Sequence, residues 1–211
     1  ISKARQFGLG AVAVRNSTHF GICGYYAKMA CEADMIGLNF TNARPSVCPT
    51  HGVQPLLGTN PICFGAPTDL DFPFIYDAAT SISQRGKIEQ FAREEKPTPS
   101  GWAIDLEGNS HTETNKLLVD LVKQTASLLP IGGTEELAGS HKGYGLSTMV
   151  EILCAALQTG SFLNQLLGKT EDGKPAPYKL GHFFLAVNID FFTDLDEFKK
   201  TSGAICRELQ N

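Results

Sequence analysis

The stretch Ala11-Val12-Ala13-Val14-Arg15-Asn16-Ser17-Thr18-His19-Phe20-Gly21 joins an apolar, strand-like run to a helix-like run over 22–33. In the second run, apolar side chains recur at intervals of three and four residues, which predicts a helix. Another strand is expected over 35–41, which completes a strand–turn–helix–strand unit. His19 would then lie just beyond the carboxyl end of a strand, where α/β proteins usually place their binding and catalytic groups.

Helices and strands alternate along the rest of the chain, without an internal repeat. Strands are expected over 61–66, 72–76, 101–105 and 182–189, and helices over 82–95, 114–127 and 145–157. A final helix is expected over 194–209, capped by Thr193, with Asp196 close to a capping-box position. The predicted class is α/β, a mixed sheet with flanking helices. The apolar face expected for the 145–157 helix consists of Leu146, Met149, Val150, Leu153 and Leu157.

Length, charge and cysteine content narrow the class of protein. The chain has 211 residues and a formal net charge of −4. It has no basic stripe, so we expect no nucleic-acid partner. It also lacks an apolar run of the roughly 18 residues that a membrane helix needs. The six cysteines form no CxxC pair, which favours free, buried thiols in a reducing, cytoplasmic compartment. Cys48 and His51 offer two metal ligands, which do not make a site, so no metal is expected.

The stretch Gly8-Leu9-Gly10-Ala11-Val12-Ala13 matches the GxGxxA pattern of dinucleotide-binding loops by its letters alone. That loop has to follow a strand and open a helix, whereas these glycines precede the strand-like run. A dinucleotide would therefore bind here without a Rossmann fingerprint.

Three polar blocks carry residue types that suit a nucleotide or a small acid. His141-Lys142-Gly143-Tyr144-Gly145 precedes a helix, and a helix N-terminus with a nearby lysine favours a phosphate; a turn-rich loop with a solvated lysine is the alternative. Asp77-Ala78-Ala79-Thr80 leaves room for a flat ligand, but an aspartate that caps the next helix explains it equally well. Thr59 and Asn60 either orient a substrate or shape a turn ahead of Pro61, and the turn is favoured.

These blocks, in their order along the chain, resemble the malate/L-lactate dehydrogenase family, which also contains sulfolactate and ureidoglycolate dehydrogenases. The resemblance includes the His19 segment, 57–61, 77–81, Gly86-Lys87 and 141–146, so residues 1–211 are interpreted as one cofactor-binding and catalytic core. It implies a non-Rossmann dinucleotide-binding fold, NAD or NADP as cofactor, and a homodimer. It also implies a helical segment of the family before Ile1 that this chain lacks, and a short tail after Asn211.

The resemblance further implies roles for individual residues. His19 aligns with the family's proton-transfer histidine, which acts while hydride moves between the nicotinamide and a 2-hydroxy or 2-keto acid. Arg44, Thr59 and Asn60 are the internal candidates for contact with the substrate, since the family's own carboxylate-binding arginines belong to the missing N-terminal segment. Cofactor contacts are implied for Ala43, through its backbone, and for Asp77, Ala78, Ala79, Lys142, Lys179, Leu180 and Gly181.

The predicted function is hydride transfer between NAD(P) and a small 2-hydroxy or 2-keto acid, with malate and oxaloacetate as the first choice. Lactate, sulfolactate and ureidoglycolate stay open as alternatives. A different hypothesis is a catalytically incomplete fragment that binds a nucleotide without turnover. A hydrolase using Ser17 or Thr18 beside His19 is disfavoured, because adjacent residues rarely align a nucleophile with its base. We interpret His51, His111 and His182 as structural or surface residues.

Overall fold

The computed structural model describes residues 1–170 and 172–210. After a short first helix, a strand, a turn, a helix and a second strand follow one another, which confirms the unit expected around His19. Gly8 ends the first helix and Gly10 lies within the first strand, so neither glycine opens a helix as a Rossmann loop would. These elements are α1 (Ser2–Phe7), β1 (Leu9–Ser17), α2 (Cys23–Cys31) and β2 (Met35–Thr41).

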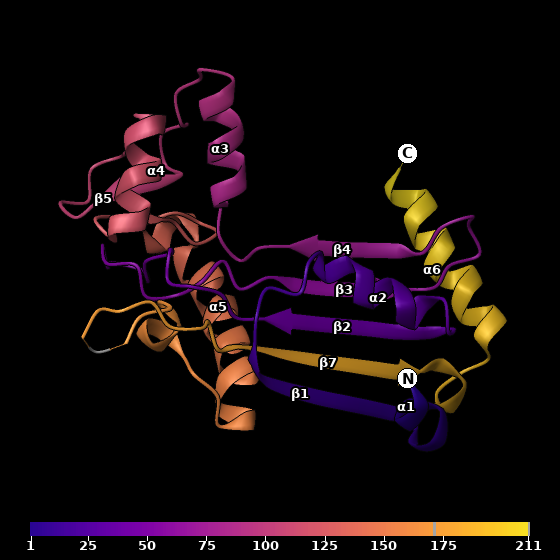
Figure 1. The fold of residues 1–211 in the computed structure, drawn as a ribbon. Helices are drawn as coiled ribbons and strands as arrows, with labels where there is room; N and C mark the ends of the chain where they lie inside the picture. The colour runs from indigo at the N-terminus through magenta and orange to yellow at the C-terminus, as the bar shows by residue number, and fades with distance from the viewer. Residues whose placement is uncertain (171, 211) are drawn as a thin grey trace.

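Five strands form one sheet in the order β1-β7-β2-β3-β4, as Figure 1 shows. The three further strands are β3 (Ile62–Ala66), β4 (Phe74–Ala78) and β7 (Leu180–Asn188). The α/β class and the flanking helices are confirmed. The expectation of a mixed sheet is corrected for these five strands, because every neighbouring pair among them is antiparallel. β1 and β2 do run parallel to each other, but β7 lies between them and removes the parallel pairing that a helical crossover would give.

The remaining elements lie at the two ends of the sheet. Figure 1 shows α3, α4 and β5 gathered near one end, and α1, α6 and both chain termini near the other. In chain order the remaining helices and strands are α3 (Arg85–Arg93), β5 (Ala103–Asp105), α4 (Thr114–Lys123), β6 (Ala126–Leu128), α5 (Ser140–Ala155) and α6 (Leu195–Leu209). Short 3-10 turns occupy Glu136–Ala138, Ala156–Gln158, Leu163–Leu166 and Ile189–Phe191. Each described helix is too short or too polar to cross a membrane.

The buried side chains form several clusters rather than one. The largest packs α3 and α4 against the small β5–β6 sheet, and a second packs α5 against β2 through Phe40, Val150 and Cys154. All six cysteines are free, and five of them are buried, as expected. The largest cluster contains Val47, Leu57, Ile88, Ala103, Leu117, Leu121, Ala126 and Leu128.

Three expected helix boundaries are corrected. The helix expected over 114–127 ends at Lys123, because Gln124 takes a left-handed conformation with φ 61° and the chain then enters β6. α5 begins at Ser140, so the block 141–145 lies inside the helix and not in a loop before it. α6 is capped by Asp194 instead of Thr193, since the Asp194 side chain accepts a hydrogen bond from the Glu197 amide at 3.0 Å.

The buried face of α5 also differs from the expected one. Leu146, Met149 and Leu157 are 41%, 40% and 59% exposed, whereas Val150 is fully buried. The helix turns small residues inward because its backbone is approached closely: a Cβ at Gly143 would overlap the carbonyl of Ile131. Its buried residues are Ser140, Gly143, Ser147, Val150, Glu151, Cys154 and Ala155.

Candidate active site

Strand register brings the expected site residues to one edge of the five-stranded sheet. Leu180, the first residue of β7, pairs with Ser17 at the end of β1. Ile62, the first residue of β3, pairs with Phe40 near the end of β2 and with Ala78 at the end of β4. We call this the site edge: the ends of β1, β2 and β4 and the starts of β3 and β7. The residues just beyond these strand ends include His19, Ala43, Asn60, Ala79 and Lys179.

His19 is exposed at the site edge, and its loop is anchored by the next residue. The Phe20 ring stacks between Tyr26 and His182, with ring centroids 4.8 Å and 4.3 Å away. The Tyr26 hydroxyl also donates to the Phe20 carbonyl at 2.8 Å. The Nδ1 atom of His19 accepts a hydrogen bond from the Gly21 amide at 3.1 Å, which places the proton of the neutral ring on Nε2.

His182 is a buried neighbour of this loop, 2% exposed, and sequence reasoning gave it no partner. Its Nδ1 lies 2.7 Å from the Thr41 hydroxyl, while its Nε2 is buried without a hydrogen-bond partner in the described part of the chain. Burial lowers the pKa of His182, and repulsion by His19 acts in the same direction. A lone histidine in the apolar run that continues with Phe183 and Phe184 was the available signal.

Asp77 acts on α2 from the neighbouring strand. Its Oδ2 accepts a hydrogen bond from the Gly24 amide at 2.6 Å, so the carboxylate stabilises the N-terminus of α2. Cys23 and Cys63 lie beside it, with the three possible ligand atoms within 4.8 Å of one another. The hydrogen bond with Cys63 and burial raise the pKa of the Cys23 thiol. The Gly24 bond supports the role of a helix cap for the Asp77 carboxylate.

The 77–80 block is tied to the 59–60 block by hydrogen bonds. The Thr80 amide and hydroxyl donate to the Thr59 carbonyl at 2.9 Å and 3.1 Å, and the same hydroxyl lies 3.1 Å from the Asn60 carbonyl. Ala78 and Ala79 are half-buried between these bonds and the end of β4. Two of the blocks singled out in the sequence are therefore one structural unit.

Asn60 is fully buried and bonded to the protein on all sides. Its Oδ1 accepts from the Ala43 amide at 3.1 Å, and its Nδ2 donates to the Ser147 carbonyl at 3.1 Å and to Glu151 at 2.9 Å. These bonds support the turn interpretation of Asn60. Glu151 was missed in the sequence, because it is not part of the apolar face expected for this helix.

Lys142 belongs to the N-terminal turn of α5, whereas Gly181 of β7 packs against the other half of this helix. Lys142 is exposed in the first turn of the helix, with no ion-pair partner within residues 1–170 and 172–210. Gly181 packs on the other half of α5, where a Cβ would overlap the Cys154 carbonyl. Its amide donates to Asn42 Oδ1 at 2.8 Å, so this backbone is already bonded inside the protein. Leu180 is likewise buried.

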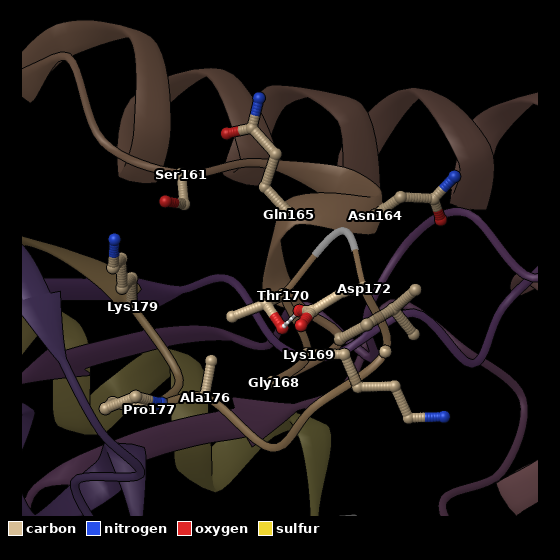
Figure 2. A pocket seen from close by; sticks show the side chains of 12 residues that line it. Ser161, Asn164, Gln165, Gly168, Lys169, Thr170, Asp172, Ala176, Pro177 and Lys179 are labelled. Atoms are coloured by element: carbon tan, nitrogen blue, oxygen red, sulfur yellow. Dashed lines mark hydrogen bonds between the residues drawn. The ribbon is translucent and has the colours of Figure 1, made fainter.

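Residues between Ser161 and Lys179, before β7, line an open hollow of about 1100 Å³. Figure 2 shows Ser161, Gln165 and Asn164 along one side of it and Lys179 and Thr170 on the other. Arg44 meets the same segment, since its guanidinium lies 4.9 Å over the Tyr178 ring and donates to the Tyr178 hydroxyl at 3.0 Å. The exposed cations Lys179 and Arg44 thus both lie beside the entrance to β7.

The whole chain matches the sequence model of one protein family, malate/L-lactate dehydrogenase, over residues 1–211. The chain belongs to this family. A malate dehydrogenase from Pyrococcus abyssi is 46% identical over 211 residues, which is 100% of this chain and 56% of that protein. A malate/(S)-sulfolactate dehydrogenase from Methanothermus fervidus is 36% identical over 100% of this chain and 58% of that protein.

The fold agrees with that of a solved member of the malate/L-lactate dehydrogenase family. The crystal structure of malate dehydrogenase from Entamoeba histolytica superposes with a TM-score of 0.94 at 46% identity, covering 99% of this chain and 57% of that one. The chain therefore spans little more than half the length of the relatives it matches. The family resemblance expected from the His19 segment and the later blocks is confirmed.

Proposed function

We propose that the protein containing this chain transfers hydride between NAD or NADP and a small 2-hydroxy or 2-keto acid, malate and oxaloacetate first. Residues 1–211 would be its cofactor-binding and catalytic core. The observation that carries this proposal is the convergence of His19 with segments 42–44, 59–60, 77–80 and 179–181 at the site edge. Membership of the family, and relatives named for malate and sulfolactate, support this class of substrate.

His19 would handle the proton. Hydride arriving at the C2 carbonyl of a keto acid leaves an alkoxide, which takes a proton from the imidazolium; in the reverse direction the neutral ring accepts one from the hydroxyl. The Gly21 amide bond to Nδ1 fits the neutral ring alone, because a protonated Nδ1 is a donor. The protonated ring must therefore release Gly21. The hydride itself is supplied by the nicotinamide when it is bound.

Two lysines would hold the cofactor's anionic groups. Lys142 combines a positive charge with the N-terminal turn of α5, a favourable place for a phosphate. Lys179 would add charge beside the hollow before β7. Ala78 and Ala79 would leave space for a flat group against the end of β4. Arg44, pre-oriented by Tyr178, would attract the substrate carboxylate.

We also propose a cytoplasmic homodimer. The free, buried thiols support a reducing compartment. The solvent-facing side of α5 exposes a row of apolar side chains, and an exposed apolar patch of this kind is typical of a protein–protein interface. This row contains Leu146, Met149 and Ile152.

The test is oxidation of NADH and NADPH by the full-length protein, followed by absorbance, with oxaloacetate, pyruvate, sulfopyruvate and oxalurate as substrates. We expect turnover with oxaloacetate. Turnover with a different member of the panel would change the substrate and keep the reaction. Cofactor binding with no turnover across the panel would contradict the dehydrogenase and favour a protein that binds nucleotide without turnover.

A further inference from the structure

Three donors converge on one buried carboxylate in the C-terminal half of α5. Glu151 is 6% exposed, and its Oε1 accepts from the Leu163 amide at 3.0 Å and from Asn42 Nδ2 at 3.4 Å. Its Oε2 accepts from Asn60 Nδ2 at 2.9 Å. No lysine, arginine or histidine forms an ion pair with it in the described ranges, so hydrogen bonds alone hold this group.

The two asparagine donors lie at different parts of the site edge. Asn42 follows β2, and its Oδ1 accepts the Gly181 amide at the start of β7 at 2.8 Å. Asn60 precedes β3, and its Oδ1 accepts the Ala43 amide at 3.1 Å. Through these two asparagines, Glu151 connects the segments around Ala43, Asn60 and Gly181, which are far apart in the sequence.

Leu163 adds a third segment to the same carboxylate. It begins the 3-10 turn Leu163–Leu166, whose next two residues, Asn164 and Gln165, line the hollow before β7. In Figure 2 both side chains lie along one side of that hollow. Glu151 therefore also fixes where this side begins.

The local chemistry selects a carboxylate over a neutral isostere. An ionised carboxylate is an acceptor on both oxygens and so can satisfy three donors, whereas a glutamine amide would turn one donor group toward another. Asn60 cannot rotate to relieve this clash, because its Oδ1 already holds the Ala43 amide. Burial without a cation is costly for a carboxylate, and it raises the pKa of Glu151. A buried carboxylate without a cation is not required for packing, so Glu151 points to a role beyond packing.

We propose that Glu151 is the positioning residue of the site edge: it sets the spacing of the 42–43, 59–60, 163–166 and 180–181 segments, and thereby the affinity for the nicotinamide cofactor. The proposal rests on the proposed dehydrogenase function. It assigns no contact between Glu151 and the cofactor, because the carboxylate acts through Asn42, Asn60 and Leu163.

The experiment compares Glu151→Gln with Val150→Ala in the full-length protein. Val150 is the matched control: it is adjacent on α5, fully buried, packs in a cluster with Phe40 and Cys154, and has no polar side-chain atom that could join the network. The dissociation constant for NADH is measured by fluorescence, well below the melting temperature of each variant. We expect it to rise about tenfold or more in Glu151→Gln, as loss of a buried network would cause. In Val150→Ala it should stay within twofold of the wild type.

A rescue experiment separates positioning from general loosening. In the double variant Glu151→Gln with Asn60→Asp, a carboxylate at position 60 can accept from both the Ala43 amide and the new amide at position 151. The carboxylate at position 60 loses the hydrogen bond that Asn60 donates to the Ser147 carbonyl and repels that carbonyl instead, so we expect partial recovery of NADH affinity over Glu151→Gln. If Glu151→Gln does not fold, Glu151→Asp keeps the charge and withdraws it by one methylene, and the same weakening is expected.

The outcomes distinguish the two proposals. Wild-type protein that binds NADH and reduces a keto acid, together with unchanged affinity in Glu151→Gln, would overturn the role of Glu151 and leave the function standing. Equal losses in Glu151→Gln and Val150→Ala would also overturn it, since the effect would then be general loosening of α5. Wild-type protein that neither binds NAD(P)H nor turns over would overturn both proposals.

Discussion

At the residue scale, the His19 loop combines an exposed imidazole with a rigid support. The ring of Phe20 is stacked on both sides, so the backbone at His19 is held while its side chain stays accessible. This arrangement suits a proton-transfer group, because the contacts of Phe20 hold the loop in place and leave the His19 ring accessible to a substrate.

Replacing His19 should therefore remove the chemistry and leave the cofactor site. In full-length His19→Ala, we expect turnover to fall by at least about a hundredfold, with the dissociation constant for NADH within a few fold of the wild type. His19→Gln, which keeps hydrogen-bonding groups but cannot transfer a proton at neutral pH, should lose turnover equally. Near-normal turnover in either variant, measured by NADH oxidation, would refute proton transfer by His19.

The lowered pKa of His182 predicts that the free energy of unfolding depends on pH. Its pKa is lowered from 6.5 in the folded chain, so below this pH the unfolded state binds more protons than the folded one. The stabilisation is fully present above about pH 6.5 and is lost as the pH falls through the lowered folded pKa. Denaturant unfolding of wild type and His182→Phe, which keeps an aromatic ring against Phe20, should show the smaller acid loss in the variant. Parallel pH curves for the two proteins would contradict this.

At the element scale, α5 shows what a sequence pattern can and cannot establish. Its period identified a helix correctly, yet the apolar side was assigned inward and proved largely exposed. The periodicity of apolar residues predicts that a segment is a helix with two different sides. It does not predict which side another backbone segment will approach closely. Such an approach occurs twice at α5: the Ile131 backbone lies against Gly143, and Gly181 of β7 lies against the Cys154 carbonyl. Glu151 was missed for the same reason.

The approach of β7 to α5 makes Gly181 a stability residue. Gly181→Ala would force its Cβ into the Cys154 carbonyl, and we expect a loss of roughly 1–3 kcal/mol in the free energy of unfolding. Gly86→Ala is the matched control, because Gly86 lies within α3 with open space at its Cβ position. It should be neutral or stabilise by up to about 1 kcal/mol. Equal effects in denaturant titrations of the two variants would show that the close approach does not matter.

At the scale of the whole molecule, the local unit around His19 and the class of the fold could be predicted, whereas the strand order could not. The order depends on pairings such as Leu9 with Val187, which no local pattern records. The site edge was predictable only as separate blocks, since each follows or precedes a strand. The buried bonds that join the blocks through Asn42, Asn60 and Glu151 depend on the three-dimensional structure.

The exposed apolar row on α5 leads to a prediction about assembly. We expect the full-length protein to have the mass of two copies by light scattering at micromolar concentration, because an uncovered row of this kind favours association. A mass of one copy across the accessible concentration range would contradict the homodimer.

Because β7 lies between β1 and β2 in the sheet, these two strands cannot complete their pairing until β7 has been synthesised. β1 and β2 are synthesised early in this chain, but β7, which pairs with both, is completed only at Asn188. Until then β1 and β2 each present an unpaired edge, which is the kind of surface that other chains capture. The nascent chain therefore exposes these two edges from the synthesis of β2 until that of β7, and this is the interval in which chaperone protection of them matters.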